Sequence, residues 1–197
     1  MTELLLATGN QNKCREYARM LAPLEIQVVS QKEAGVFAQV EETGSSFEEN
    51  AYIKAKALYD ATGKPAVADD SGLEVTALHG APGIYSARYA GENADDFERN
   101  QKLLKELDGE SDRSAQFVCV ICYINKDGEP FYARGVCKGT IAKTAVGNDG
   151  FGYDPIFLVG AKTFAQLSGE EKDQISHRGN ALRAFLEFLK KEKEDDQ

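Results

Sequence analysis

Blocks of apolar and polar positions alternate along the chain and predict strands and helices in turn. Short apolar runs predict strands at residues 3–7, 25–30, 66–75, 114–124 and 130–138. Apolar residues at helical spacing predict helices at residues 13–22, 46–62, 93–107 and 180–190. Charged residues 192–197 are expected to form a frayed tail. The length of 197 residues and the hydrophobic content of 42% predict one substantial core and one or at most two lobes.

Two adjacent carboxylates, Asp69 and Asp70, interrupt the apolar run of residues 66–75 and precede Ser71 and Gly72. Successive side chains of a strand point to opposite faces, so the two acids should lie on opposite sides. At most one of them faces water easily, and the other must be paired, hydrogen-bonded or metal-bound. An Asp-Ser-Gly turn at a strand end is the simpler interpretation. The rest of the chain favours a metal or general-base site.

The first strand leads through Thr8-Gly9-Asn10-Gln11-Asn12-Lys13 into a helix. Free backbone N–H groups at a helix start bind anions, and Lys13 can add a positive charge for a phosphate. The alternative is a capped turn with a solvated lysine.

The helix at residues 46–62 opens with Ser46 and Glu49, which fit a capping box. Asn50 and Lys54 share one face of this helix because they are four residues apart. Small residues surround Lys54, so another element can approach it closely. A surface lysine is the alternative.

The glycine-rich stretch at residues 146–157 contains two aromatic residues and an acid. Its glycines allow a close backbone approach to a ligand. Phe151 and Tyr153 offer flat faces for a base, and Asp154 can orient a donor. Alternatively, the aromatic residues fill the core.

Three hydrogen-bond donors, Lys172, His177 and Arg178, gather around the start of the last helix. They suit an acceptor-rich ligand, although a lone histidine is usually structural. Just before them, Ser168 and Glu171 fit a second capping box.

Composition excludes several functional classes. The net charge of −9 argues against a nucleic-acid or anionic-membrane surface. The absence of a long apolar run and of a signal-type start predicts a cytoplasmic protein. Cys119 and Cys122 are three positions apart in a predicted strand, which places them on opposite faces as small buried apolar residues rather than a metal or redox pair.

Six motifs occur in an order and at spacings that together resemble the inosine triphosphate pyrophosphatase family. They are Thr8-Gly9-Asn10 with Lys13, Glu49-Asn50-Ala51 with Lys54-Ala55, Ala68-Asp69-Asp70-Ser71-Gly72-Leu73, Gly80 to Arg88, Gly150 to Pro155, and Ser176 to Gly179. The resemblance runs from residue 4 to about residue 189. Each motif alone is weakly specific, whereas the six in order are highly specific.

The resemblance implies that residues 1–197 form a single α/β domain with an elongated mixed β-sheet flanked by helices. Two lobes would enclose a central nucleotide-binding cleft. Family members hydrolyse ITP, dITP and XTP to the monophosphate and pyrophosphate with Mg²⁺, and they are usually homodimers. A pyrimidine-directed, Maf-like pyrophosphatase and a non-catalytic nucleotide-binding protein are the rival interpretations.

Roles carried over from the family are those of a phosphate-cleaving site. Asp70 matches the proton acceptor and a metal-associated acid, and Lys54 matches a catalytic lysine near the phosphates. Glu41 matches a second metal-associated acid, although Glu42 beside it leaves the register open. Substrate contacts match Thr8, Gly9, Asn10, Gln11, Asn12, Lys13, Ser71, Phe151, Gly152, Tyr153, Asp154, Lys172, His177 and Arg178.

Overall fold

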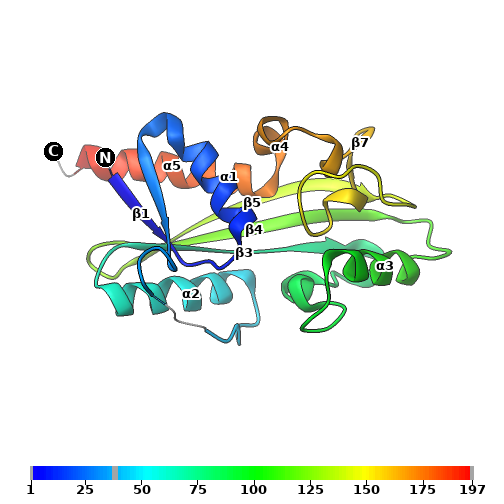
Figure 1. The fold of residues 1–197 in the computed structure, drawn as a ribbon, viewed down its shortest axis with the longest axis horizontal. Helices are drawn as coiled ribbons and strands as arrows, with labels where there is room; N and C mark the ends of the chain where they lie inside the picture. Colours follow the sequence, from blue (N-terminus) through cyan, green and yellow to red (C-terminus); the bar gives the residue numbers. More distant parts are fainter. Residues whose placement is uncertain (1, 37–39, 196–197) are drawn as a thin grey trace. The chain divides into compact units, whose positions relative to one another are not determined.

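A computed structural model describes residues 2–36 and 40–195 of the chain. Within these residues, strands form one sheet in the order β2-β1-β3-β4-β5-β6-β7 (Figure 1). Their bounds are β1 Thr2–Leu6, β2 Ile26–Ser30, β3 Ala66–Val75, β4 Ser114–Ile124, β5 Pro130–Ile141, β6 Phe157–Val159 and β7 Lys162–Thr163. Strand β1 pairs in parallel with β2 and β3, whereas β6 pairs antiparallel with β5 and β7. The predicted mixed α/β sheet is confirmed.

The helices include five α-helices and several short 3₁₀ segments in the described residues. The α-helices are α1 Gln11–Leu21, α2 Phe47–Thr62, α3 Asp96–Glu106, α4 Gly169–Ile175 and α5 His177–Asp195. The 3₁₀ segments are Ala22–Leu24, Thr76–Leu78, Gly83–Arg88, Asp154–Ile156 and Phe164–Gln166.

The chain divides into two compact units, and the boundary crosses the long strands β3, β4 and β5. The first unit comprises the described residues of Met1–Asp70, Cys119–Gly135 and Arg178–Gln197. The second comprises Ser71–Val118 and Val136–His177. Because the boundary falls between Asp70 and Ser71, β3 carries the candidate acid at the end of its first-unit part.

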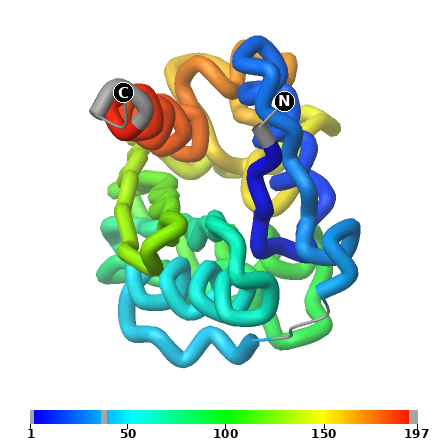
Figure 2. Tube along the Cα trace, turned by 90° about the vertical axis from the view of Figure 1, so that its left-hand side faces the viewer, coloured from blue at the N-terminus to red at the C-terminus, as the bar shows by residue number. Residues whose placement is uncertain are grey.

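In the first unit, helices cover both faces of the sheet. Helix α2 lies on one face, and α1 and α5 lie on the other (Figure 1). Figure 2 shows α2 and α5 well separated when the molecule is turned by 90°. The core beneath α1 and α5 joins Leu6, Tyr17, Val67, Ile121 and Phe185, all of them buried. Burial of these side chains on one face of each helix fixes α1 and α5 on the sheet.

The second unit has its own apolar core. Aromatic rings form its centre: Phe117 packs edge-on against Phe157 with ring centroids 4.6 Å apart, and it stacks with Phe164 at 5.8 Å. Leu73 and Leu103 of β3 and α3 are fully buried in the same cluster.

Several boundaries differ from the sequence prediction. Helix α5 starts at His177 and continues to Asp195, so the tail predicted to fray at residue 192 is helical as far as residue 195. The short strands β6 and β7 were not predicted, since runs of three and two residues carry no usable periodicity. Residues 37–39 of the predicted loop and residues 196–197 of the predicted tail lie outside the described residues.

The two predicted capping boxes have different outcomes. At α4, Ser168 and Glu171 cap each other's backbone as predicted. At α2, Ser46 accepts the hydrogen bond from the Glu49 N–H, but the Glu49 carboxylate binds the N–H and hydroxyl of Ser45 at 2.7 and 2.9 Å. The second half of this capping box is therefore displaced by one residue.

Candidate active site

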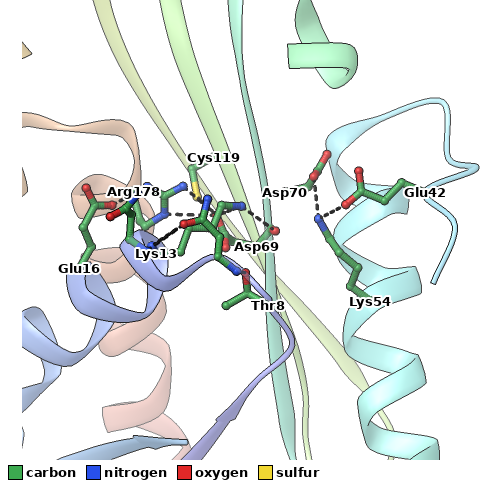
Figure 3. A network of polar contacts seen from close by, with 11 residues as sticks. Thr8, Lys13, Glu16, Glu42, Lys54, Asp69, Asp70, Cys119 and Arg178 are labelled. Carbon is green, nitrogen blue, oxygen red and sulfur yellow. Dashed lines mark hydrogen bonds and ion pairs between the residues drawn. The ribbon is translucent and has the colours of Figure 1, made fainter. Parts of the chain in front are cut away.

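Asp69 and Asp70 point away from β3 in opposite directions (Figure 3). Asp69 is 1% exposed and Asp70 is 5% exposed. The predicted opposite orientation is confirmed, and neither acid faces water, in keeping with the expectation that at most one of them would. Both carboxylates are buried, and each is compensated by its own cations.

On one face of β3, Asp69 binds two cations that come from distant segments. Its Oδ2 lies 3.0 Å from Lys13 Nζ of α1 and accepts hydrogen bonds from Arg178 Nε and Nη2 at 3.2 and 3.1 Å. Arg178 Nη1 also donates to Glu16 Oε2 at 2.5 Å (Figure 3). Arg178, at the start of α5, thus ties α1 and β3 together.

This network holds Asp69 in its charged form. Burial by itself would raise the pKa of Asp69, but Lys13 and Arg178 outweigh burial and bring it well below its ordinary value. Burial would likewise lower the pKa of Arg178, yet Asp69 and Glu16 bring it well above its ordinary value. A carboxylate held this firmly as an anion is a poor proton acceptor.

On the other face, Asp70 contacts Lys54 of α2. Asp70 Oδ1 and Glu42 Oε1 each lie 2.7 Å from Lys54 Nζ of α2 (Figure 3). Burial raises the pKa of Asp70, and Lys54 offsets that rise only in part. Burial opposes the charge of Lys54, but Asp70 and Glu42 together raise the pKa of its ammonium group. Asp70 is therefore the better proton acceptor of the adjacent pair.

The neighbouring acids Glu41 and Glu42 have different surroundings. Glu41 is exposed, whereas Glu42 is half-buried and binds Lys54. Glu42 is therefore the acid that shares Lys54 with Asp70, and the assignment of Glu41 as a metal-associated acid stays a prediction. Alternate residues of an extended segment point in opposite directions, so only one of the two acids can turn toward α2.

Asn50 holds the segment that carries Glu42. Asn50 is fully buried one turn before Lys54 on α2, and its Oδ1 accepts a hydrogen bond from the Gly44 N–H at 2.8 Å. A Cβ on Gly44 would lie 2.6 Å from that oxygen and 2.7 Å from the Glu49 Cβ. Only glycine fits so close to the helix, and the contact sets the path of the chain two residues after Glu42.

The Thr8–Lys13 turn joins β1 to α1 as predicted, but its N–H groups are partly used. Asn10 is the N-cap, and its Oδ1 accepts hydrogen bonds from the Asn12 and Lys13 N–H groups at 2.9 and 3.3 Å. Thr8 Oγ1 accepts one from the Asn10 N–H at 3.1 Å. The expectation of free N–H groups at this helix start is wrong for Asn12 and Lys13, and Gln11 is an exposed residue of the first turn.

In the second unit, Phe151, Asp154 and Lys172 form one group. Lys172 Nζ lies 2.6 Å from Asp154 Oδ2 and 4.8 Å from the centroid of the Phe151 ring. Asp154 Oδ2 also accepts the Phe151 N–H at 2.9 Å. The prediction that Asp154 orients a donor is confirmed, and the donor is Lys172.

Tyr153 and His177 lie in the core of the second unit. The Tyr153 ring is buried, and its hydroxyl donates to the Ser86 carbonyl at 2.9 Å, so the alternative that this aromatic fills the core is correct. His177 is buried with its ring stacked on Phe117 at 4.5 Å. Ser71 is half-buried directly after Asp70, and Gly152 precedes Tyr153 with a positive φ of 64°.

Glu16 and Asn50 of these networks were not assigned a role from the sequence, whereas Glu42 was left open as the alternative to Glu41. Asn50 had a usable signal, its spacing of four residues from Lys54 on one helix face. Glu16 had none, because its partner Arg178 is 162 positions away.

None of the helices within residues 2–36 and 40–195 is long and apolar enough to cross a lipid bilayer. The four cysteines are free thiols, and Cys119 and Cys122 are buried as predicted.

Comparisons with known proteins place the chain in one family. The family model described as the Ham1 family matches residues 4–188. A dITP/XTP pyrophosphatase of Yersinia pseudotuberculosis is 51% identical over 196 residues, covering 96% of this chain and 99% of the relative. The structure of the Staphylococcus aureus Ham1 protein has a TM-score of 0.87 and 48% identity, covering 97% of this chain and all of that chain. A Ham1 protein from Coxiella burnetii has a TM-score of 0.88 at the same identity and coverage.

Proposed function

Because this chain belongs to the Ham1 family, we propose that it hydrolyses non-standard purine nucleoside triphosphates. The substrates are dITP, ITP and XTP, and the products are the nucleoside monophosphate and pyrophosphate. Relatives about half identical over nearly their whole length carry the name dITP/XTP pyrophosphatase. Within the structure, the observation that carries the proposal is the buried Asp70–Lys54 pair.

The reaction requires water to attack the α-phosphorus. The new P–O bond forms as the bond from the α-phosphorus to the bridging oxygen breaks, and pyrophosphate leaves with the electron pair. Asp70 takes the proton of the attacking water, for which its raised pKa suits it better than Asp69. Lys54 keeps the Asp70 carboxylate oriented and offsets negative charge that spreads over the phosphate oxygens.

The residues around Asp70 fit a Mg²⁺ ion. Asp70 Oδ2 is buried and accepts no hydrogen bond from any described residue. Glu42, which binds Lys54 as Asp70 does, supplies a second carboxylate. No group of three or more His, Cys, Asp or Glu in the described residues is arranged to hold a metal. Mg²⁺ usually binds one or two carboxylates together with water and substrate phosphates. Asp70 and Glu42 would hold the ion, which supplies charge neutralisation at the phosphates when bound.

Lys13 and the Thr8–Lys13 turn are proposed to bind the triphosphate. Asp69 holds the Lys13 ammonium at 3.0 Å in the first turn of α1, close to the turn's backbone. A helix start and a cation together favour an anion at this place.

The base is proposed to bind at the Phe151–Lys172 group. Inosine and xanthine carry an acceptor oxygen at C6, where adenine carries an amino group. Lys172 is a donor held by Asp154 next to an aromatic ring, so it matches an oxo base and rejects an amino base. Arg178 is 2% exposed and engaged with Asp69 and Glu16, so its proposed contact with the base stays a prediction.

Pyrophosphate release from ITP, XTP, GTP, ATP and dTTP, each with and without Mg²⁺, tests the proposal. Fast Mg²⁺-dependent release from ITP and XTP alone is the expected result. Release from dTTP instead would favour the pyrimidine-directed alternative. Tight nucleotide binding without release from any substrate would contradict catalysis and the role of Asp70. The homodimer and the cytoplasmic location stay predictions.

A further inference from the structure

Two side chains of helix α3 form hydrogen bonds with the backbone of Gly152, in the loop that carries Phe151. Asp96 Oδ2 accepts a hydrogen bond from the Gly152 N–H at 2.6 Å, and Asn100 Nδ2 donates one to the Gly152 carbonyl at 3.0 Å. Asp96 and Asn100 are four residues apart, so their side chains share one face of α3. We call this pair of contacts the Gly152 clamp.

The clamp fixes both peptide planes beside Gly152. Its N–H belongs to the peptide that follows Phe151, and its carbonyl belongs to the peptide that precedes Tyr153. Gly152 has a φ of 64°, in the left-handed region where glycine moves most freely. Two hydrogen bonds of opposite polarity remove that freedom and define the direction in which the chain leaves Phe151.

The residue before the clamp carries the candidate base-binding group. The Phe151 N–H is held by Asp154 Oδ2, which also binds Lys172 Nζ at 2.6 Å. The Phe151 ring and the Lys172 ammonium therefore share one anchor. A rotation at Gly152 would move the Phe151 side of this group relative to Tyr153, whose hydroxyl is tied to Ser86.

Burial makes the Asn100 contact hard to replace. Asn100 is 4% exposed, so water has little access to the carbonyl of Gly152 on that side. The Asp96 side chain is 46% exposed and also pairs with Arg99, so its contact can be removed with less disturbance to the core. Asn100 is thus the buried residue of the clamp, and Asp96 is the accessible one.

We propose that Asp96 and Asn100 are positioning residues for base recognition. They lock Gly152 so that Phe151 and Lys172 are presented together to the purine. The inference rests on the proposed function, because it takes the Phe151–Lys172 group as the site of the base. Neither Asp96 nor Asn100 touches the phosphates in this assignment, so the chemical step is left intact.

Four variants test the clamp by steady-state pyrophosphate release from dITP and dGTP. Asn100→Leu removes the donor while keeping a side chain branched at Cγ, and Asp96→Ala removes the acceptor from an accessible position. Asp96→Asn keeps an acceptor oxygen and is the conservative rescue. Gln101→Ala, an exposed change on the same helix, is the matched control. Thermal unfolding of each variant checks folding, and Asp96→Ala carries the test if Asn100→Leu does not fold.

We expect KM for dITP to rise about tenfold in Asn100→Leu and Asp96→Ala with kcat nearly unchanged, because ground-state base binding is weakened. We expect the preference for dITP over dGTP to fall by about the same factor. Asp96→Asn and Gln101→Ala should behave like the unsubstituted protein. Unchanged KM and preference in the folded variants would overturn the proposal, as would an equal loss of kcat on both substrates.

Calorimetric binding of IMP separates this inference from the proposed function. If the unsubstituted protein releases pyrophosphate from no purine triphosphate, the proposed function fails. The clamp still predicts that Asn100→Leu or Asp96→Ala binds IMP about tenfold more weakly than the unsubstituted protein. Equal IMP affinity, or no IMP binding by the unsubstituted protein, would overturn the clamp.

Discussion

Asp69 and Asp70 are neighbours in β3, yet their pKa values are shifted in opposite directions. Asp69 faces Lys13 and Arg178, which outweigh burial and lower its pKa. Asp70 contacts Lys54, which also binds Glu42, and burial outweighs this cation, so the pKa of Asp70 is raised. The pleat of the strand gives the two acids different neighbours, and in the proposed function Asp70 is the one that accepts the proton.

Replacing Asp70 by Asn should abolish most of the turnover without unfolding the protein. A positioned general base contributes about 10²–10⁴-fold, so kcat for ITP should fall by that order. Pyrophosphate release at saturating ITP measures the effect, and circular dichroism checks the fold. An Asp70→Asn protein with near-full turnover would refute the assignment of the base.

The pH dependence of kcat/KM should show an acid limb above the ordinary Asp value of 3.8. Asp70 must be unprotonated to accept a proton, so activity falls as pH drops through its raised pKa. Lys54→Met removes the cation that holds this pKa down and should move the acid limb to higher pH. Lys56→Met, next but one on α2 and paired with exposed Asp60, is the control and should leave the limb in place. An acid limb that shifts equally in Lys54→Met and Lys56→Met would contradict its assignment to Asp70.

Asp69→Asn should destabilise the protein more than Asp70→Asn. Removing one member of a buried ion-pair network costs about 3–5 kcal/mol of unfolding free energy, because Arg178 and Lys13 lose their partner. Urea unfolding of both variants measures the difference. Equal stability of the two variants at neutral pH would contradict the larger contribution expected of the Asp69 network.

The stabilising contribution of Asp69 should depend on pH in a defined direction. Its pKa is lower in the folded protein than its ordinary value of 3.8, so its contribution is fully present above 3.8 and is lost as pH falls through the lowered pKa. The stability difference between the unsubstituted protein and Asp69→Asn should therefore shrink below pH 3.8. A difference that stays constant across this range would contradict the ion-pair account.

Glu42→Gln should weaken the response to Mg²⁺, whereas Glu41→Gln should not. Glu42 shares Lys54 with Asp70, and Glu41 is exposed. We expect the Mg²⁺ concentration for half-maximal activity to rise at least about tenfold in Glu42→Gln. Titration of both variants with Mg²⁺, and with Mn²⁺ followed by electron paramagnetic resonance, compares them. A larger rise in Glu41→Gln than in Glu42→Gln would instead assign the metal-associated role to Glu41.

Gly44→Ala should impair activity through the segment that carries Glu42. The added Cβ would lie 2.6 Å from Asn50 Oδ1 and 2.9 Å from the Asn50 backbone nitrogen, so the Gly44–Asn50 hydrogen bond must break. We expect kcat/KM to fall about tenfold or more, since displaced site residues lose much of their contribution. Thr43→Ala, an exposed change at the preceding residue, is the control and should have little effect.

The sequence by itself determined the features that depend on neighbouring residues. The apolar run before Asp69 predicted β3, and the pleat placed Asp69 and Asp70 on opposite faces. Ser168 and Glu171 predicted the start of α4. Six motifs in order predicted the family. Each of these depends on contacts within a few positions of the chain, where spacing and geometry are directly related.

Only the tertiary structure decided which charges compensate one another. The pairing of Arg178 with Glu16 spans 162 positions, and that of Arg178 with Asp69 spans 109. That Glu42 rather than Glu41 binds Lys54 depends on where Lys54 of α2 lies, and the Gly152 clamp depends on a helix 52 positions upstream. No periodicity or motif in the sequence predicts these contacts, because the partners come together only when the sheet places distant segments side by side. The packing of these distant segments also decides how deeply each acid is buried. The balance between burial and the nearest cations then sets the pKa of each acid.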